Sequence, residues 1–170
     1  MKRLLLIIAM GFLSHIFASA VDGDRLTPYP APRIEALNQD GGTVKLDEIY
    51  RKGLTLVYFY PKAGTPGCTS QSCSLRDAYE ELTQRGVQVI GVSMDKVEAQ
   101  KKFRVKNKLP FTLLADPEGK VVKAFGVGSL LGFASRQAYL IKDGNVIWRD
   151  KKASTSEQAA DVLRVLKELK

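Results

Sequence analysis

Hydrophobic residues along the chain fall into two patterns, short continuous runs and stripes with a spacing of three or four residues. Continuous runs predict strands that are buried on both faces, and the stripes predict amphipathic helices. The predicted strands comprise residues 54–60, 87–93, 111–115, 138–141 and 146–148. The predicted helices comprise residues 68–85, residues 97–108 and a C-terminal stretch that Ser154 and Glu157 would open as a capping box.

Turn-forming residues separate these elements. Residues 33–46 have the pattern of a hairpin closed around the Gln-Asp-Gly-Gly segment at 39–42. The Lys-Asp-Gly-Asn segment at 142–145 joins the last two strands, since Asp-Gly suits a type I′ turn. Three prolines within residues 21–33 favour an extended lead-in before the domain.

The order of elements is strand, helix, strand, helix, strand, strand hairpin and helix. Helices that connect successive strands imply parallel pairing, and the late hairpin adds an antiparallel edge. The sequence therefore predicts an α/β fold with a mixed central sheet, helices on both faces and an N-terminal hairpin extension. This order is compatible with a thioredoxin-like fold.

The first twenty residues have the pattern of a signal peptide. Lys2 and Arg3 precede an apolar run over residues 4–13, and small residues at 18–20 provide a cleavage site. An uncleaved membrane anchor is the alternative, although the stretch 4–20 is marginal in length for a spanning helix. We expect cleavage, export to the bacterial periplasm and no stable membrane insertion afterwards.

Cleavage would leave residues 21–33 as the lead-in and residues 34–170 as one domain, which is long enough to bury an ordinary core. It would lower the formal net charge from +8 to +6 at pH 7, because the leader carries two basic residues and no acidic residue. The remaining basic residues are interspersed with acidic ones, which indicates a solvated surface. We therefore expect no nucleic-acid partner.

The residue inventory narrows the possible chemistry. The only histidine, His15, lies in the leader, and the only cysteines are Cys68 and Cys73. Structural zinc sites use four Cys or His ligands, and cysteine proteases need an imidazole base. The mature chain provides neither set, and a mixed Cys and His copper site is disfavoured for the same reason. No metal and no cofactor are expected.

Cys68 stands where a helix is predicted to begin. Thr65 is a suitable N-cap, and Pro66 suits the first helical position because its missing N–H would have no partner there. Cys68 would then lie in the first turn, where unpaired N–H groups and the positive end of the helix dipole stabilise an anion. A thiolate is such an anion, so Cys68 is a candidate nucleophile.

Cys73 follows Cys68 by five residues. In an intact helix this spacing separates the two Cα atoms by about 8.6 Å, whereas a disulfide requires about 4.4–6.8 Å. The two cysteines could therefore bridge only after the first turns unwind, which argues against a static structural disulfide. An even number of cysteines in an exported protein nevertheless keeps the structural alternative open.

At this point the sequence resembles a known family. The pattern Pro61-x3-Thr65-x2-Cys68 resembles the active-site motif of the peroxiredoxins. The spacing from Cys68 to Cys73, followed by Leu-Arg-Asp at 75–77, is similar to the bacterioferritin comigratory protein (Q-type) branch. Further blocks with the same likeness follow in the same order, at residues 91–95, 109–116 and 125–127.

The resemblance implies a thiol-dependent peroxidase that reduces hydrogen peroxide and organic hydroperoxides. Cys68 would attack the peroxide and become a sulfenic acid, and Cys73 would then form an intrachain disulfide with it. Thr65 would orient the peroxide, Pro61 would shield the site from water, and Arg136 would hold the thiolate. The family further implies a thioredoxin-like protein as the reductant and a monomeric enzyme.

Two other interpretations stay open. A thiol–disulfide oxidoreductase of the same fold would exchange disulfides with proteins, but its two cysteines are normally separated by two residues rather than by four. An exported binding domain would carry Cys68 and Cys73 as a purely structural disulfide. Reactivity of Cys68 toward peroxide separates the peroxidase from both.

Overall fold

The computed structural model describes residues 24–169 of the chain. The predicted signal peptide, residues 1–20, lies outside the described residues. No helix within residues 24–169 is both long and apolar enough to span a membrane. The strands are β1 (Asp24–Pro30), β2 (Glu35–Asn38), β3 (Thr43–Lys45), β4 (Leu54–Phe59), β5 (Val87–Ser93), β6 (Thr112–Ala115), β7 (Ser129–Leu130), β8 (Phe133–Ala134), β9 (Gln137–Lys142) and β10 (Asn145–Asp150). The helices are α1 (Leu46–Tyr50), α2 (Pro66–Asp77), α3 (Tyr79–Gln84), α4 (Val97–Lys106), α5 (Lys120–Ala124) and α6 (Gln158–Glu168).

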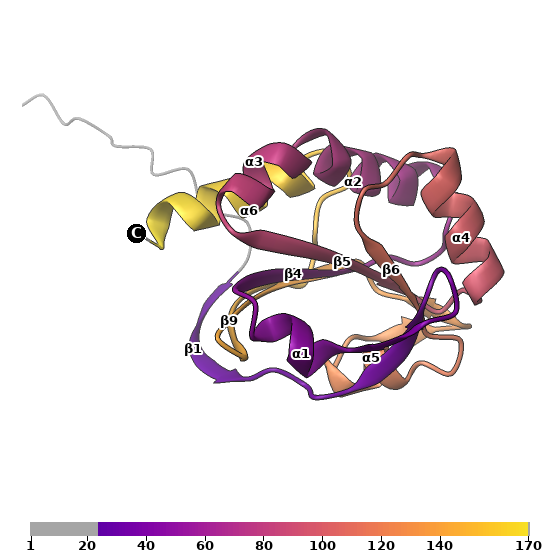
Figure 1. Ribbon diagram of the computed structural model, residues 1–170, viewed down its shortest axis with the longest axis horizontal. Helices are drawn as coiled ribbons and strands as arrows, with labels where there is room; N and C mark the ends of the chain where they lie inside the picture. The colour runs from indigo at the N-terminus through magenta and orange to yellow at the C-terminus, as the bar shows by residue number, and fades with distance from the viewer. Residues whose placement is uncertain (1–23, 170) are drawn as a thin grey trace, which may run out of the picture.

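Eight strands form one mixed sheet in the order β1-β10-β9-β4-β5-β6-β2-β3 (Figure 1). The three central strands β4, β5 and β6 are parallel, as the crossover helices predicted. The hairpin of β9 and β10 joins β4 in antiparallel orientation. It does not form the edge, because β1 pairs antiparallel with β10. The extended lead-in expected before the domain thus contains an edge strand, which the sequence analysis did not anticipate.

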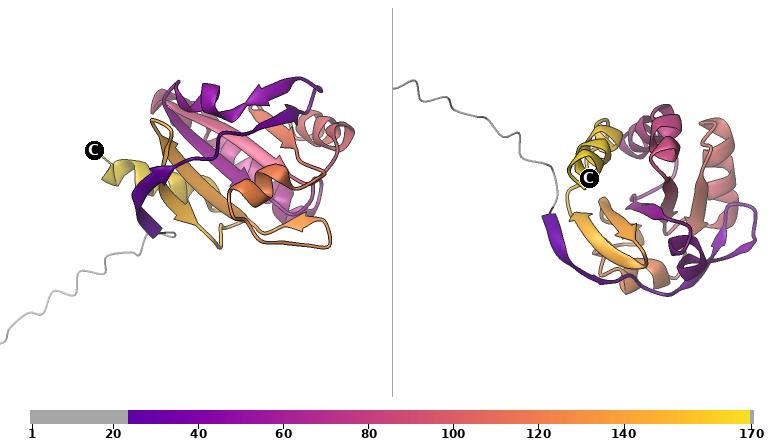
Figure 2. Two further views of the ribbon diagram at one scale, coloured as in Figure 1. Left: turned by 90° about the horizontal axis from the view of Figure 1, so that it is seen from below. Right: turned by 60° about the vertical axis from the view of Figure 1, so that its left-hand side comes forward.

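Helices cover both faces of the sheet, which confirms the predicted fold class (Figures 1 and 2). Helices α2, α3, α4 and α6 lie on one face and α1 and α5 on the other. Strand β4 has alternating side chains that enter both cores: Leu56 and Tyr58 pack beneath α2, whereas Val57 and Phe59 face α5. Burial on both faces explains the continuous apolar run in this strand.

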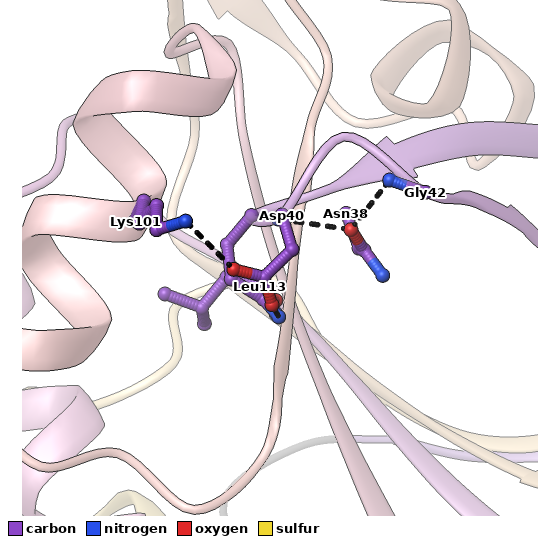
Figure 3. A network of polar contacts seen from close by, with 6 residues as sticks. Asn38, Asp40, Gly42, Lys101 and Leu113 are labelled. Atoms are coloured by element: carbon purple, nitrogen blue, oxygen red, sulfur yellow. Dashed lines mark hydrogen bonds and ion pairs between the residues drawn. The ribbon is translucent and has the colours of Figure 1, made fainter.

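The predicted N-terminal hairpin is β2 and β3, and its turn lies at residues 39–42 as expected. The side chain of Asn38 closes the turn by accepting the backbone N–H groups of Asp40 and Gly42, both at 2.9 Å (Figure 3). The Lys101 ammonium lies 3.4 Å from the Asp40 carboxylate, so this turn also contacts α4. Strand β2 continues the sheet by pairing antiparallel with β6.

Two helix predictions were wrong in detail. The helix predicted at 68–85 begins at Pro66 and is interrupted at Ala78, where the chain bends so that Tyr79 and Leu82 both pack against the core. The capping box does not form, because α6 begins at Gln158 and its N-cap is Glu157. The Ser154 hydroxyl instead donates to the buried Asp161 carboxylate in the first turn of α6, at 2.8 Å. Helices α1 and α5 have five residues each, too few for a recognisable stripe.

Gly91 provides space beneath the helix layer. It lies in β5 between Tyr58 of β4 and Leu113 of β6, and an added Cβ would lie 2.7 Å from Leu113 Cδ2 and 2.8 Å from the Tyr58 ring. We expect Gly91→Ala to lower the free energy of unfolding by about 1–3 kcal/mol through overpacking, measured by chemical denaturation. Gly42→Ala is the control, because its Cβ would lie no closer than 3.3 Å to its nearest neighbour, the Asn38 side chain. Equal stability of the two variants would contradict this packing argument.

Candidate active site

The site lies where the chain leaves the central sheet at the carboxyl end of β4 and enters α2. Thr65 is the N-cap residue of α2, with φ −75° and ψ 153°, and Pro66 occupies the first position of the helix. Both placements confirm the sequence prediction. Cys68 is the third residue of α2 and therefore lies in its first turn, as expected. The backbone N–H groups of Gly67 and Cys68 have no carbonyl partner one turn earlier, as at any helix start.

The Cys68 sulfur lies beside a permanent cation, the Arg136 guanidinium. Arg136 Nη2 donates to Cys68 Sγ at 3.5 Å, and Cys68 is fully buried. Arg136 immediately precedes β9, the strand that pairs with β4, so the sheet brings this distant residue to the start of α2. Gly67 allows the approach, since a Cβ there would lie 3.3 Å from Arg136 Nη2. The guanidinium charge and the positive end of the α2 dipole thus both lie at the Cys68 sulfur.

Gln71 fixes the orientation of the Arg136 guanidinium, and the sequence analysis missed it. Its side-chain oxygen accepts a hydrogen bond from Arg136 Nη1, and its Nε2 donates to Gln158 Oε1 at 2.9 Å. Gln71 and Gln158 are both fully buried. Gln71 thus holds Nη1 of the guanidinium, while Nη2 is directed at Cys68. A glutamine in a predicted helix has no sequence signal that would distinguish it from a surface residue.

The loop before α2 is anchored to the sheet by Asp95. The Asp95 carboxylate accepts the backbone N–H of Ala63 at 2.7 Å and the hydroxyl of Ser93 at 2.7 Å. Asp95 follows β5, which is parallel to β4, so the carboxyl ends of both strands meet at this edge. An anchoring contact of this kind could have been predicted from the sequence, because polar residues that follow neighbouring parallel strands share one edge of the sheet.

Thr65 and Pro61 lie in this same loop. The Thr65 hydroxyl donates to the backbone carbonyl of Lys62 at 3.1 Å, so its proton is engaged and its lone pairs can accept a hydrogen bond. Pro61 is half-buried and directly follows Tyr60. Thr65 directly precedes α2 and Pro61 begins the loop that leads to it, and their roles toward a peroxide stay predictions.

Cys73 lies farther along the same helix. It is half-buried, and both cysteines are free thiols within continuous α2. Beneath this segment, the hydroxyls of Tyr58 and Ser72 are hydrogen bonded at 2.9 Å. Burial is the main cause that raises the pKa of Tyr58, so its hydroxyl remains neutral. The helix is therefore intact while the thiols are reduced, as the spacing of the cysteines requires.

Within residues 24–169, no cluster of three or more His, Cys, Asp or Glu side chains could hold a metal ion. The functional groups that the structure brings together are the Cys68 thiol, the Arg136 guanidinium and the backbone N–H groups at the start of α2. Fold and site together define a thioredoxin-like domain with a buried, cation-paired cysteine at a helix N-terminus.

Comparison with known proteins gives the same class. The model of the AhpC/TSA family matches residues 28–149. Peroxiredoxin Bcp of Bacillus subtilis is 38% identical over 148 residues, which cover 82% of this chain and 93% of the relative. The chain therefore belongs to the AhpC/TSA family, within which its relatives are peroxiredoxins of the Bcp and Q type, and it is a thiol-dependent peroxidase.

Solved structures agree with this assignment. Peroxidoxin BcpB of Mycobacterium tuberculosis has a TM-score of 0.74 at 30% identity, covering 88% of this chain and 97% of the other. The bacterioferritin comigratory protein of Xanthomonas campestris has a TM-score of 0.76 at 26% identity, covering 86% of this chain and 99% of the other. Its structures were determined to study its alkyl peroxide reduction activity.

Removing the Arg136 cation should slow the reaction of Cys68 with peroxide. We expect Arg136→Met to lower the second-order rate of Cys68 oxidation by about 10²-fold, as for other groups that stabilise charge at a reacting centre. Arg136→Lys should restore part of the rate, because it retains the charge but not the two-pronged geometry. The second-order rate of Cys68 oxidation is measured after rapid mixing of the reduced protein with hydrogen peroxide.

Arg51→Met is the matched control, since Arg51 is exposed and its ion pair within residues 24–169 is with Asp47 on α1, far from Cys68 in the chain. A loss of rate as large in this control as in Arg136→Met would show that net charge, and not the contact with Cys68, is responsible.

Proposed function

We propose that this chain reduces hydroperoxides with Cys68 as the peroxidatic residue and Cys73 as the resolving residue. The observation that carries the proposal is the hydrogen bond from Arg136 to the buried Cys68 sulfur in the first turn of α2. A fixed cation at a thiol, together with free helix N–H groups, suits a reaction in which negative charge moves from sulfur to oxygen. Hydrogen peroxide and organic hydroperoxides are the proposed substrates.

In the first step, the Cys68 thiolate attacks the terminal oxygen of the hydroperoxide. The S–O bond forms as the O–O bond breaks, so the sulfur is oxidised to sulfenic acid and the peroxide is reduced. The alkoxide or hydroxide that leaves takes up a proton and becomes an alcohol or water. The lone pairs of Thr65 Oγ1 can accept a hydrogen bond from the peroxide O–H, since the Thr65 hydroxyl donates its own hydrogen to the backbone carbonyl of Lys62. Pro61 shields the reacting atoms from water.

In the second step, Cys73 attacks the sulfenic sulfur. The S–S bond forms, the S–O bond breaks and hydroxide leaves as water after protonation. Because both cysteines belong to continuous α2, this step requires local unwinding of the helix. A thioredoxin-like protein then supplies two thiols, which reduce the disulfide by exchange and become oxidised themselves.

The burial of Cys68 favours this function over general disulfide exchange. A sulfur with no exposed surface cannot be reached by the disulfide of a folded protein, whereas a peroxide of a few atoms needs only small side-chain movements. The cysteines also lie in helical register at a spacing that prevents direct bridging. The reductant would act only after unwinding has exposed the disulfide.

The proposal includes export to the bacterial periplasm. Its support is the basic start, apolar run and small residues of positions 1–20. In that compartment the reductant would be an exported thioredoxin-like protein, and the enzyme would act as a monomer without stable membrane insertion.

Mass spectrometry after brief exposure to hydrogen peroxide tests both cysteine roles. We expect the wild type to form a disulfide between Cys68 and Cys73, and Cys73→Ser to accumulate a trappable sulfenic acid at Cys68. Cys68→Ser should lose turnover while it keeps the fold, because Cys68 is small and serine nearly fills its place. A wild-type protein whose Cys68 remains reduced, or a Cys68→Ser variant that keeps turnover, would refute the proposal.

Fractionation of cells that express the full chain tests export. We expect activity in the periplasmic fraction and a mature chain that begins at Val21, read by mass measurement of the intact protein. A chain that keeps residues 1–20 and sediments with membranes would instead support the uncleaved anchor.

A further inference from the structure

Hydrogen bonds from two sides, from the sheet and from α6, hold the segment of α2 between the two cysteines. Ser72 bonds to Tyr58 of β4, and Gln71 bonds to both Arg136 and Gln158. Gln71, Ser72 and Gln158 all have no exposed surface. Each of these polar groups would lose a buried partner if the helix unwound here, and a buried hydrogen bond that is broken costs more than an exposed one.

Gln158 brings the C-terminal helix into this network. It is the first residue of α6, which lies beside α2 on the same face of the sheet (Figures 1 and 2). Its Oε1 accepts from Gln71 Nε2 at 2.9 Å, and the next residue, Ala159, donates its backbone N–H to Ser74 Oγ at 3.3 Å. Two adjacent residues at the start of α6 thus hold α2 at Gln71, between the cysteines, and at Ser74, just after Cys73.

Formation of the disulfide must break the hydrogen bond between Gln71 and Gln158. The two sulfurs can meet only if the backbone between Cys68 and Cys73 leaves the helical path. Gln71 lies three residues after Cys68 and two before Cys73, so its side chain cannot stay in place during this change. Gln158, in contrast, contacts neither sulfur through any hydrogen bond described for it and can remain with α6.

We propose that the hydrogen bond between Gln71 and Gln158 is a latch that sets the rate at which Cys73 resolves the Cys68 sulfenic acid. Gln158 is a positioning residue in this role and takes no part in the attack on peroxide. The inference rests on the proposed function, in particular on resolution through unwinding of α2.

The latch also sets the balance between resolution and over-oxidation. While α2 is closed, the sulfenic acid can meet a second hydroperoxide, which oxidises it to sulfinic acid and is itself reduced to an alcohol or water. Once α2 opens, Cys73 removes the sulfenic acid instead. A weaker latch therefore speeds disulfide formation and lowers the fraction of Cys68 lost to sulfinic acid at a given peroxide concentration.

Gln158→Met is the test variant. Methionine has a similar length and flexibility but offers no strong acceptor to Gln71. It also removes Gln158 Nε2, which is buried and makes no hydrogen bond within the described residues, so the overall stability should change little. Val165→Ala is the matched control, because Val165 is a buried residue of α6 that lies two turns after Gln158, packs in the same core and has no side-chain group that could hydrogen bond to Gln71.

Rapid-quench mass spectrometry after mixing with hydrogen peroxide resolves the two steps. In Gln158→Met, we expect the first-order rate of disulfide formation to rise about fivefold, the factor that corresponds to one ordinary net hydrogen bond. The second-order rate of Cys68 oxidation should change much less, and the sulfinic fraction should fall. Val165→Ala should resolve at the wild-type rate.

Hydrogen exchange of the reduced protein provides a second measurement. Backbone amides of residues 69–73 should exchange faster in Gln158→Met than in the wild type, and Gln158→Asn, whose amide is too short to reach Gln71, should behave in the same way. Unchanged disulfide formation in both Gln158 variants, or equal acceleration in Val165→Ala, would overturn the latch while leaving the proposed function intact. Failure of the wild type to form the disulfide would overturn both.

Discussion

The contact between the Arg136 guanidinium and the Cys68 sulfur is the interaction on which the other features of the site depend. It joins a residue before β9 to a residue at the start of α2, and it is possible only because β9 pairs with β4. Gly67 leaves space for the guanidinium, and Gln71 holds its other side. A charge placed in this way needs no rearrangement when the thiolate reacts, and such preorganisation is a main source of electrostatic catalysis.

Helix α2 must satisfy two opposing requirements. Its first turn has to be intact to present N–H groups to the sulfur beside Arg136, yet in the proposed function the same turn has to unwind before Cys73 can bond to Cys68. The structure meets both because the segment between the cysteines is held by a few side-chain hydrogen bonds, whereas Leu75 anchors the later part of the helix in the core. A few specific bonds can be broken locally without loss of the whole fold.

Much of the fold could be predicted from the sequence, because buried strands and long helices carry strong periodic signals. Strand β5 has the predicted bounds, and the placement of Thr65, Pro66 and Cys68 followed from helix-start preferences. The contact with Arg136 depended on the resemblance to a family, since nothing local distinguishes it from other arginines. Gln71 and Gln158 could not be predicted, because their importance lies in a tertiary contact between helices 87 residues apart in the chain.

The two sides of the active site are anchored to different parts of the molecule. Asp95, which follows a central strand, holds the loop before α2 through the Ala63 N–H, whereas Gln158 of the peripheral helix α6 holds the segment between the cysteines. The loop that carries Pro61 and Thr65 can therefore stay on the rigid sheet while the neighbouring helical turns unwind. In the proposed cycle, this division would let the site return to its peroxide-reducing geometry after each disulfide is reduced, because only the half attached to α6 would have to refold.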